Sequence, residues 1–136
     1  MRVAFPSGTR SSPLDRNPST VAQGGSASAT GGQDNQVATY TVPANRRADV
    51  AVQSAGVIIV ALVAAQAGNN RILGPGATNV YDQQAQPTAP VGTRVDSPSI
   101  HMQLRAGEQV QIRVVAGAGA GQIGVTGGIH GVEYDA

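Results

Sequence analysis

The sequence predicts an all-β protein, an antiparallel β-sandwich most simply of jelly-roll type, with an extended N-terminal arm. Several segments alternate apolar and polar residues with a period of two, the pattern of a strand with one buried face. Turn residues separate these segments at regular short spacing, and no segment shows helical periodicity. The longest apolar run, residues 57–65, is rich in β-branched residues, which favour extended backbone. About eight short strands are expected, as in a jelly roll.

Residues 1–35 are predicted to form an extended or disordered arm, and residues 36–136 the β-sandwich domain. The first segment holds three prolines, two Gly-Gly pairs and many Ser and Thr, without apolar periodicity. Such a segment buries too little apolar surface to offset the entropy lost when it becomes ordered. Arg2 and Phe5, the only Phe of the chain, are candidate anchors that would dock on a partner.

The domain begins with two predicted strands. Residues 36–42 alternate in period two, residues 43–45 have turn chemistry, and residues 48–53 form a second short strand. Residues 67–70 tolerate positive φ and are expected to close the next strand. Residues 71–98 are expected to be irregular, with short edge strands.

The apolar run after Gly56 predicts a buried strand. Successive side chains of a strand point to opposite faces, so an unbroken apolar run indicates that both faces are covered. One cover is the core of the domain, and the other is an outside partner. Ile58, Val60 and Leu62 form one set and Val57, Ile59 and Ala61 the other, and Val57 and Ile59 are the candidate partner contacts.

The clearest predicted hairpin spans residues 99–116, with two alternating strands around a turn at 106–108. A glycine-rich connector follows, and residues 122–126 and 128–134 are predicted as the last two strands. Ile129 is out of phase with the apolar residues after it, which a β-bulge at Gly131 would reconcile.

Composition excludes several classes of function. The chain has no Cys, so disulfides and Cys-based metal sites are excluded. Its net charge is +1 and no basic cluster stands out, unlike in a nucleic-acid-binding protein. No secretory signal is visible, and the longest apolar run is shorter than the roughly 20 residues of a membrane helix. Only 12% of residues are charged, and all nine cations are Arg. This composition is typical of interfaces, and equally of drift in a GC-rich genome.

Residues 119–124 match the GxGxxG pattern of dinucleotide-binding loops. That pattern requires a helix starting at the glycines, whose N-terminus holds the pyrophosphate, and an acidic residue about 20 positions on. The residues after Gly121 are predicted to form a strand, and the sequence ends twelve residues after Gly124. A flexible connector is therefore the favoured interpretation, and no cofactor is expected.

A metal or catalytic site is also disfavoured. His101, His130, Glu133 and Asp135 are the candidate ligands, but His130 and Glu133 are an odd number of residues apart and face opposite sides of a regular strand. No Ser lies in a GxSxG elbow, and no paired carboxylates stand out. The sequence predicts a protein that is not an enzyme.

Four features together resemble small bacteriophage structural proteins of jelly-roll type: the glycine-rich arm, YTVPANRR (residues 40–47), LRAGEQVQIRV (104–114) and GGIHGVEYD (127–135). In particular, the chain resembles the capsid cement (decoration) protein of short-tailed Bordetella phages. The resemblance implies a protein of the virion exterior, made in the host cytoplasm, that binds the outer surface of the shell and bridges neighbouring capsomers. It also implies stabilisation of the head against the pressure of its DNA.

The partners that this resemblance implies are the major capsid protein and other copies of the chain. A dimer is favoured and a trimer is possible, with no direct binding to nucleic acid or membrane. Arg46 and Arg47, within the YTVPANRR segment, join Arg2, Phe5, Val57 and Ile59 as candidate partner-binding residues. A phage tail-fibre or receptor-binding β-sandwich domain is the alternative, and a cupin-type enzyme, which needs a cluster of His ligands, is a third hypothesis.

Overall fold

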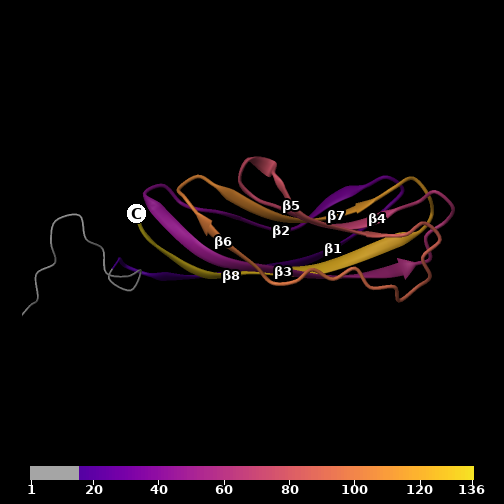
Figure 1. Ribbon diagram of the computed structural model, residues 1–136, viewed down its shortest axis with the longest axis horizontal. Helices are drawn as coiled ribbons and strands as arrows, with labels where there is room; N and C mark the ends of the chain where they lie inside the picture. The colour runs from indigo at the N-terminus through magenta and orange to yellow at the C-terminus, as the bar shows by residue number, and fades with distance from the viewer. Residues whose placement is uncertain (1–15) are drawn as a thin grey trace, which may run out of the picture.

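The computed structural model describes residues 16–136 as two antiparallel sheets of four strands, packed face to face as two layers (Figure 1). A single 3₁₀ turn (Pro75–Ala77) interrupts the strands. In chain order the strands are β1 (Ser19–Thr30), β2 (Asp34–Thr41), β3 (Arg46–Val60), β4 (Gly68–Leu73), β5 (Asn79–Ala85), β6 (Ile100–Leu104), β7 (Gln109–Ala116) and β8 (Gln122–Asp135).

The connectivity is that of a jelly roll, as the sequence predicts. One sheet has the order β1-β8-β3-β6 and the other β2-β7-β4-β5. Consecutive strands lie in opposite sheets, with the exception of the β4–β5 pair, so nearly every connection crosses from one layer to the other. All pairings are antiparallel.

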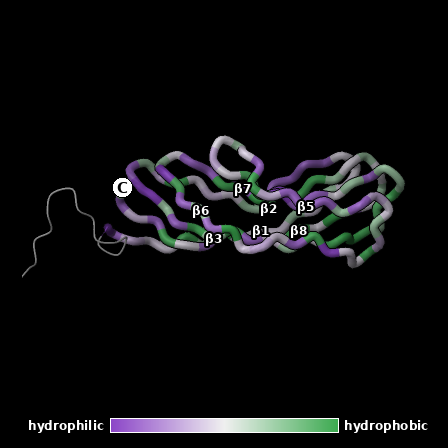
Figure 2. Tube along the Cα trace, in the orientation of Figure 1, coloured by the Kyte–Doolittle hydropathy of each residue, from purple (hydrophilic) through white to green (hydrophobic). Residues whose placement is uncertain are grey.

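Aliphatic side chains from the inner faces of both sheets form the core, and Figure 2 shows hydrophobic segments facing each other between the layers. The two layers interlock closely at Gly127. A Cβ built there would lie 2.6 Å from Ile112 Cδ1 of the opposite sheet, so the missing side chain is the space that Ile112 fills. Residues that are fully buried include Val50, Val52, Ile58, Ile72, Val110, Ile112, Val114, Ile123 and Ile129.

The sandwich begins at Ser19 and not near Gln36, because β1 lies within the segment that the sequence analysis placed in the arm. β1 pairs with β8 along its whole length without a register shift. Backbone hydrogen bonds to β8 hold it, and only Val21 and Ala29 of its side chains are buried in the core. A strand fixed mainly through its backbone needs no alternating apolar pattern, which is why composition misidentified it. The structure does not describe residues 1–15.

The predicted hairpin over residues 99–116 is wrong. β6 pairs with β3 and β7 pairs with β2 and β4, so the two strands lie in opposite sheets. The turn between them is held by the residue that follows β2, since Val42 exchanges backbone hydrogen bonds of 2.9 and 3.0 Å with Gly107 and Glu108. Alternation correctly identifies the inward face of each strand, but it does not specify which strand is its neighbour.

In two places, two predicted short strands are one long strand in the structure. These long strands are β3 and β8. β3 runs through Ser54, whose N–H donates to Ser97 Oγ at 2.9 Å and whose hydroxyl donates to Asn70 Oδ1 at 2.8 Å. Buried polar groups are thus satisfied in the middle of the strand. β8 likewise passes through Gly127, and its register with β1 and β3 shows no bulge at Gly131. Every second residue from Ile129 therefore continues to face inward, as far as Glu133.

The region between β3 and β6 agrees partly with expectation. β4 and β5 occupy the predicted short strands, and a long loop follows. The expected turn at 67–70 is wrong, because Gly68 already starts β4 and the chain reverses at Ala65, which has a φ of 64°. Asn70, expected in that turn, is fully buried and donates to Val95 O at 2.8 Å.

Candidate functional site: the outer face of the β1-β8-β3 sheet

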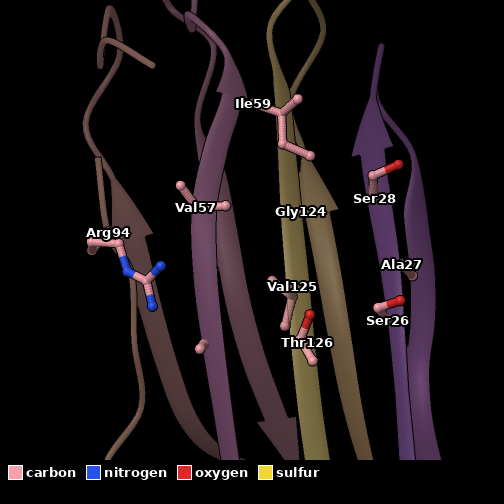
Figure 3. Close-up of a pocket in the computed structure, with 10 residues that line it drawn as sticks. Ser26, Ala27, Ser28, Val57, Ile59, Arg94, Gly124, Val125 and Thr126 are labelled. Atoms are coloured by element: carbon pink, nitrogen blue, oxygen red, sulfur yellow. The ribbon is translucent and has the colours of Figure 1, made fainter. Parts of the chain in front are cut away.

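Three strands of one sheet form a shallow groove of about 500 Å³ on the outer face of the sandwich (Figure 3). Register defines its floor: Ser28, Gly124 and Val57 form one row across β1, β8 and β3. Ser26, Thr126 and Ala55 form the next row. Small side chains and hydroxyls thus alternate with aliphatic groups over a nearly flat surface.

Ile59 lies across the end of this groove. Its side chain is 45% exposed, and a Cβ at Gly124 would lie 2.6 Å from Ile59 Cδ1, so glycine is what lets Ile59 lie over β8. The pairing of β3 with β8 shifts register between Ile58 and Val60, which leaves Val60 exposed as well. We call Val57 and Ile59 the outer pair.

Two further exposed aliphatic residues, Val63 and Val91, lie near this end of β3. Val63 follows β3 in the next loop, and Val91 precedes Gly92, whose N–H donates to Ile58 O at 2.9 Å. Large apolar side chains left in water carry a free-energy cost that burial against a partner removes, at about 25 cal/mol per Å². Exposed apolar side chains that gather in one region are characteristic of interaction sites.

Charge is sparse around the groove. Arg94 is the only charged side chain among the residues that line it, and it pairs with Asp96 at 3.0 Å. Both members of this pair are largely exposed, so it contributes little to stability. Arg94 lies at the margin of the groove beside Val57, with which it forms an isolated β-bridge (Figure 3).

The predicted partner-binding residues fall in three places. Val57 and Ile59 lie together on the outer face of β3 in the groove. Arg47 is exposed at the other end of β3, next to a small hollow of about 180 Å³ that Tyr134 and Gln103 also line. Arg2 and Phe5 lie outside the described residues.

Arg46, the remaining candidate, is occupied within the chain. Its Nη1 donates to Asp135 Oδ1 at 2.7 Å and to Asn17 O at 3.0 Å, and its Nη2 donates to Ser19 Oγ and Glu133 O, both at 3.1 Å. The side chain is only 12% exposed. Arg46 therefore ties the start of β1 to the end of β8, an intramolecular role that sequence alone did not suggest.

Next to Arg46, the half-buried carboxylate of Glu133 lies between the sheets. Tyr40 Oη donates to Glu133 Oε2 at 2.5 Å, while Arg46 Nε lies 3.6 Å from Glu133 Oε1. Burial raises the pKa of Tyr40 well above its ordinary value, and the hydrogen bond to Glu133 and the charge of that carboxylate raise it further. The positive charge of Arg46 lowers the pKa of Tyr40, against these effects.

Alkaline pH should therefore destabilise the protein through Tyr40. A raised folded-state pKa means that the contribution is complete below the unfolded pKa of about 10 and is lost as pH rises above it, by up to about 1.4 kcal/mol per pH unit. Tyr40→Phe should remove the contribution of this ionisation, so that the free energy of unfolding falls less steeply between about pH 10 and 11. Urea unfolding across that range measures the slope, and equal slopes for the two proteins would contradict this assignment.

The candidate metal ligands are dispersed. His101 and His130 point outward from β6 and β8, each beside Ala51 in the register, while Glu133 faces inward. Over residues 16–136, no group of three or more His, Cys, Asp or Glu side chains is placed to hold a metal ion. No helix in the same range is long and apolar enough to cross a membrane.

The GxGxxG segment leads from a turn into β8 and not into a helix. Its glycines make room for Gln66: a Cβ at Gly119 or Gly121 would lie 2.6–2.7 Å from Gln66 Oε1. The expected flexible connector is instead tied to a buried side chain.

Sequence reasoning missed several residues that line the groove. Ser26 and Ser28 lie on β1, which the arm assignment concealed, and Thr126 and Arg94 carried no pattern that set them apart. The register of β1 with β8 brings Ser26, Ser28 and Thr126 together, and the bridge to Val57 places Arg94 beside them; both are visible only in the fold.

No protein-family model matches the chain, and no curated protein matches it either. Among solved structures it is similar to the infectious bursal disease virus VP2 subviral particle, with a TM-score of 0.41 and 11% identity over 88% of this chain and 37% of that chain. The Gt strain of that virus gives a TM-score of 0.39 and 11% identity over 88% and 33%. This chain spans about a third of the solved chains it matches. Similarity this distant says nothing about what the chain binds.

Proposed function

We propose that this chain is a structural protein of a virion, which binds the outer surface of a bacteriophage capsid and cements neighbouring capsomers. The observation that supports this function is the outer pair: Ile59 is exposed and Val57 half-buried over a glycine- and serine-lined groove on a well-packed sandwich. A surface with these properties gains free energy by being covered, and it needs no chemistry to do so. The major capsid protein is the proposed cover.

The strength of such attachment comes from repetition. One copy would bury a modest interface, on the order of 1,000–2,000 Å² in total. The segment that carries Arg2 and Phe5 is proposed to add a second, tethered contact, which raises effective concentration. Because the groove has one charged lining residue, already paired, salt should weaken attachment little. Self-association on the shell completes the proposal, with a dimer favoured over a trimer.

Comparison of complete particles with particles that lack this protein tests the proposal. Cement function predicts that the incomplete particles release DNA at a lower temperature and adsorb normally to host cells. If they keep the heat stability of complete particles and fail to adsorb, the chain is instead a receptor-binding domain of the tail-fibre type. A fluorescent dye that reports DNA release and a plain adsorption assay provide the two readouts.

A further inference from the structure

Within residues 16–136, strand β1 forms an open edge of its sheet. In the order β1-β8-β3-β6, only one side of β1 is paired by the described part of the chain. Ser28 O accepts a hydrogen bond from Asn35 Nδ2 at 2.7 Å, so this carbonyl points away from β8. Because backbone groups of an antiparallel strand alternate in direction and β1 has no register shift, Thr20, Ala22, Gly24 and Ser26 also direct their N–H and C=O groups to the open edge.

Side chains of the following turn and of β2 occupy the edge at Ser28 and Thr30, but from Thr20 to Ser26 it has none of the usual protection. Natural proteins discourage pairing at sheet edges with charged side chains, prolines, bulges or very short strands. β1 has twelve residues and contains no charged residue and no proline, and its pairing with β8 is continuous. Thr20, Ala22 and Gly24 are exposed. An unblocked edge of this length is suited to accept another strand.

We propose that a second copy of this chain pairs with β1 through its own β1, antiparallel across a two-fold axis. An uncharged strand that presents alternating donors and acceptors is complementary to itself when reversed, so no other protein is required. The pairing joins the two sheets into one continuous sheet of eight strands, twice the four of each copy. It also brings the two grooves onto the same outer face, since Ser26 and Ser28 line the groove. This inference does not depend on capsid binding.

The direction of the backbone groups restricts the register. Edge-directed residues must face edge-directed residues, so both members of each facing pair have even numbers. An axis at Gly24 pairs Ala22 with Ser26 and Thr20 with Ser28, and it places Pro18 only opposite Thr30, whose N–H and C=O are already bonded to Gln33. An axis at Ala22 or Gln23 would place Pro18, which has no N–H to donate, opposite Ser26 or Ser28. An axis at Gly25 would place Thr20 opposite the occupied groups of Thr30. We therefore place the axis at Gly24.

A proline variant tests the interface. In Ala22→Pro the lost N–H is one that points to the open edge, so the β8 ladder stays intact. Ala22→Val is the matched control, because it keeps the N–H. Sedimentation velocity of the full chain at micromolar concentration should give twice the 13.7 kDa of one chain for wild type and Ala22→Val, and one chain for Ala22→Pro. A monomeric wild type, or a folded Ala22→Pro that stays dimeric, would overturn the proposal.

Cysteine cross-linking tests the register without relying on that variant. The chain has no Cys, so a single introduced thiol is unambiguous. Two Gly24 positions on the axis would be about 5.5 Å apart at Cα, within disulfide range, whereas two Ala22 positions would be offset by about 13 Å along the strands. Under mild oxidation Gly24→Cys should form a covalent dimer and Ala22→Cys should not. Equal cross-linking of the two, or none in either, would contradict the pairing.

Discussion

Replacing Gln66 by Leu should destabilise the protein by roughly 2–6 kcal/mol, a large part of the about 5–15 kcal/mol that holds a typical domain folded. Gln66 is fully buried. Its Oε1 accepts from Gly121 N at 2.8 Å and Val63 N at 3.2 Å, and its Nε2 donates to Gly121 O at 2.7 Å and Gly117 O at 3.3 Å. Leu fills similar space but leaves the N–H groups of Gly121 and Val63 unpaired, at about 1–3 kcal/mol for each buried one. The two carbonyls keep other donors, since Gly117 O also accepts from Gly32 N and Gly121 O from Thr30 Oγ1.

Urea unfolding measures the loss, with Gln103→Leu as the control because Gln103 is exposed on β6. The control should stay within about 0.5 kcal/mol of wild type. If Gln66→Leu also does so, the side chain does not stabilise the loops at that end of the sandwich.

Charge substitutions at adjacent positions of β3 should have opposite consequences. Ile58 is 0% exposed, so Ile58→Asp buries an unpaired carboxylate and should cost more than about 4 kcal/mol, enough to prevent folding. Ile59 is 45% exposed, so Ile59→Asp should leave the unfolding temperature unchanged. If the shell protein covers the outer pair as proposed, the same change should weaken capsid binding by about tenfold or more, because it places a charge in that contact.

Val80→Asp is the matched control for this comparison. Val80 is 43% exposed, nearly the same as Ile59, but it lies on β5 in the opposite sheet. Co-sedimentation with capsids lacking the protein should therefore separate the two variants, with Val80→Asp binding like wild type. Equal loss of binding in both would mean that the outer pair is not the contact surface.

The sequence predicted strands well where one face is apolar and alternates with a polar face. β2, β6 and β7 are of this kind, and each inward face was identified correctly. Partner choice was not predictable, because β6 and β7 lie in opposite sheets although their alternation is the same as that of a hairpin. β1 was missed because it is held through backbone hydrogen bonds, which leave no side-chain signature.

The candidate site was predicted in part. An apolar run of nine residues indicated that β3 carries aliphatic groups on two faces, and Val57 and Ile59 do lie outward. Arg46 was assigned to a partner because an Arg near a turn is indistinguishable by sequence from one folded back onto Asp135. The burial of Gln66 was not predictable either, because a single Gln in an alanine-rich segment is more often exposed than buried.

The central claim is that this protein stabilises a DNA-filled head by adding contacts, and add-back to depleted particles tests it most directly. Purified protein is titrated onto particles that lack it, and bound copies and the temperature of DNA release are measured together. Cement function predicts that the release temperature rises with occupancy and levels off at a fixed ratio to the shell protein, in low and high salt alike. A release temperature that stays constant while the protein binds to saturation would contradict the account.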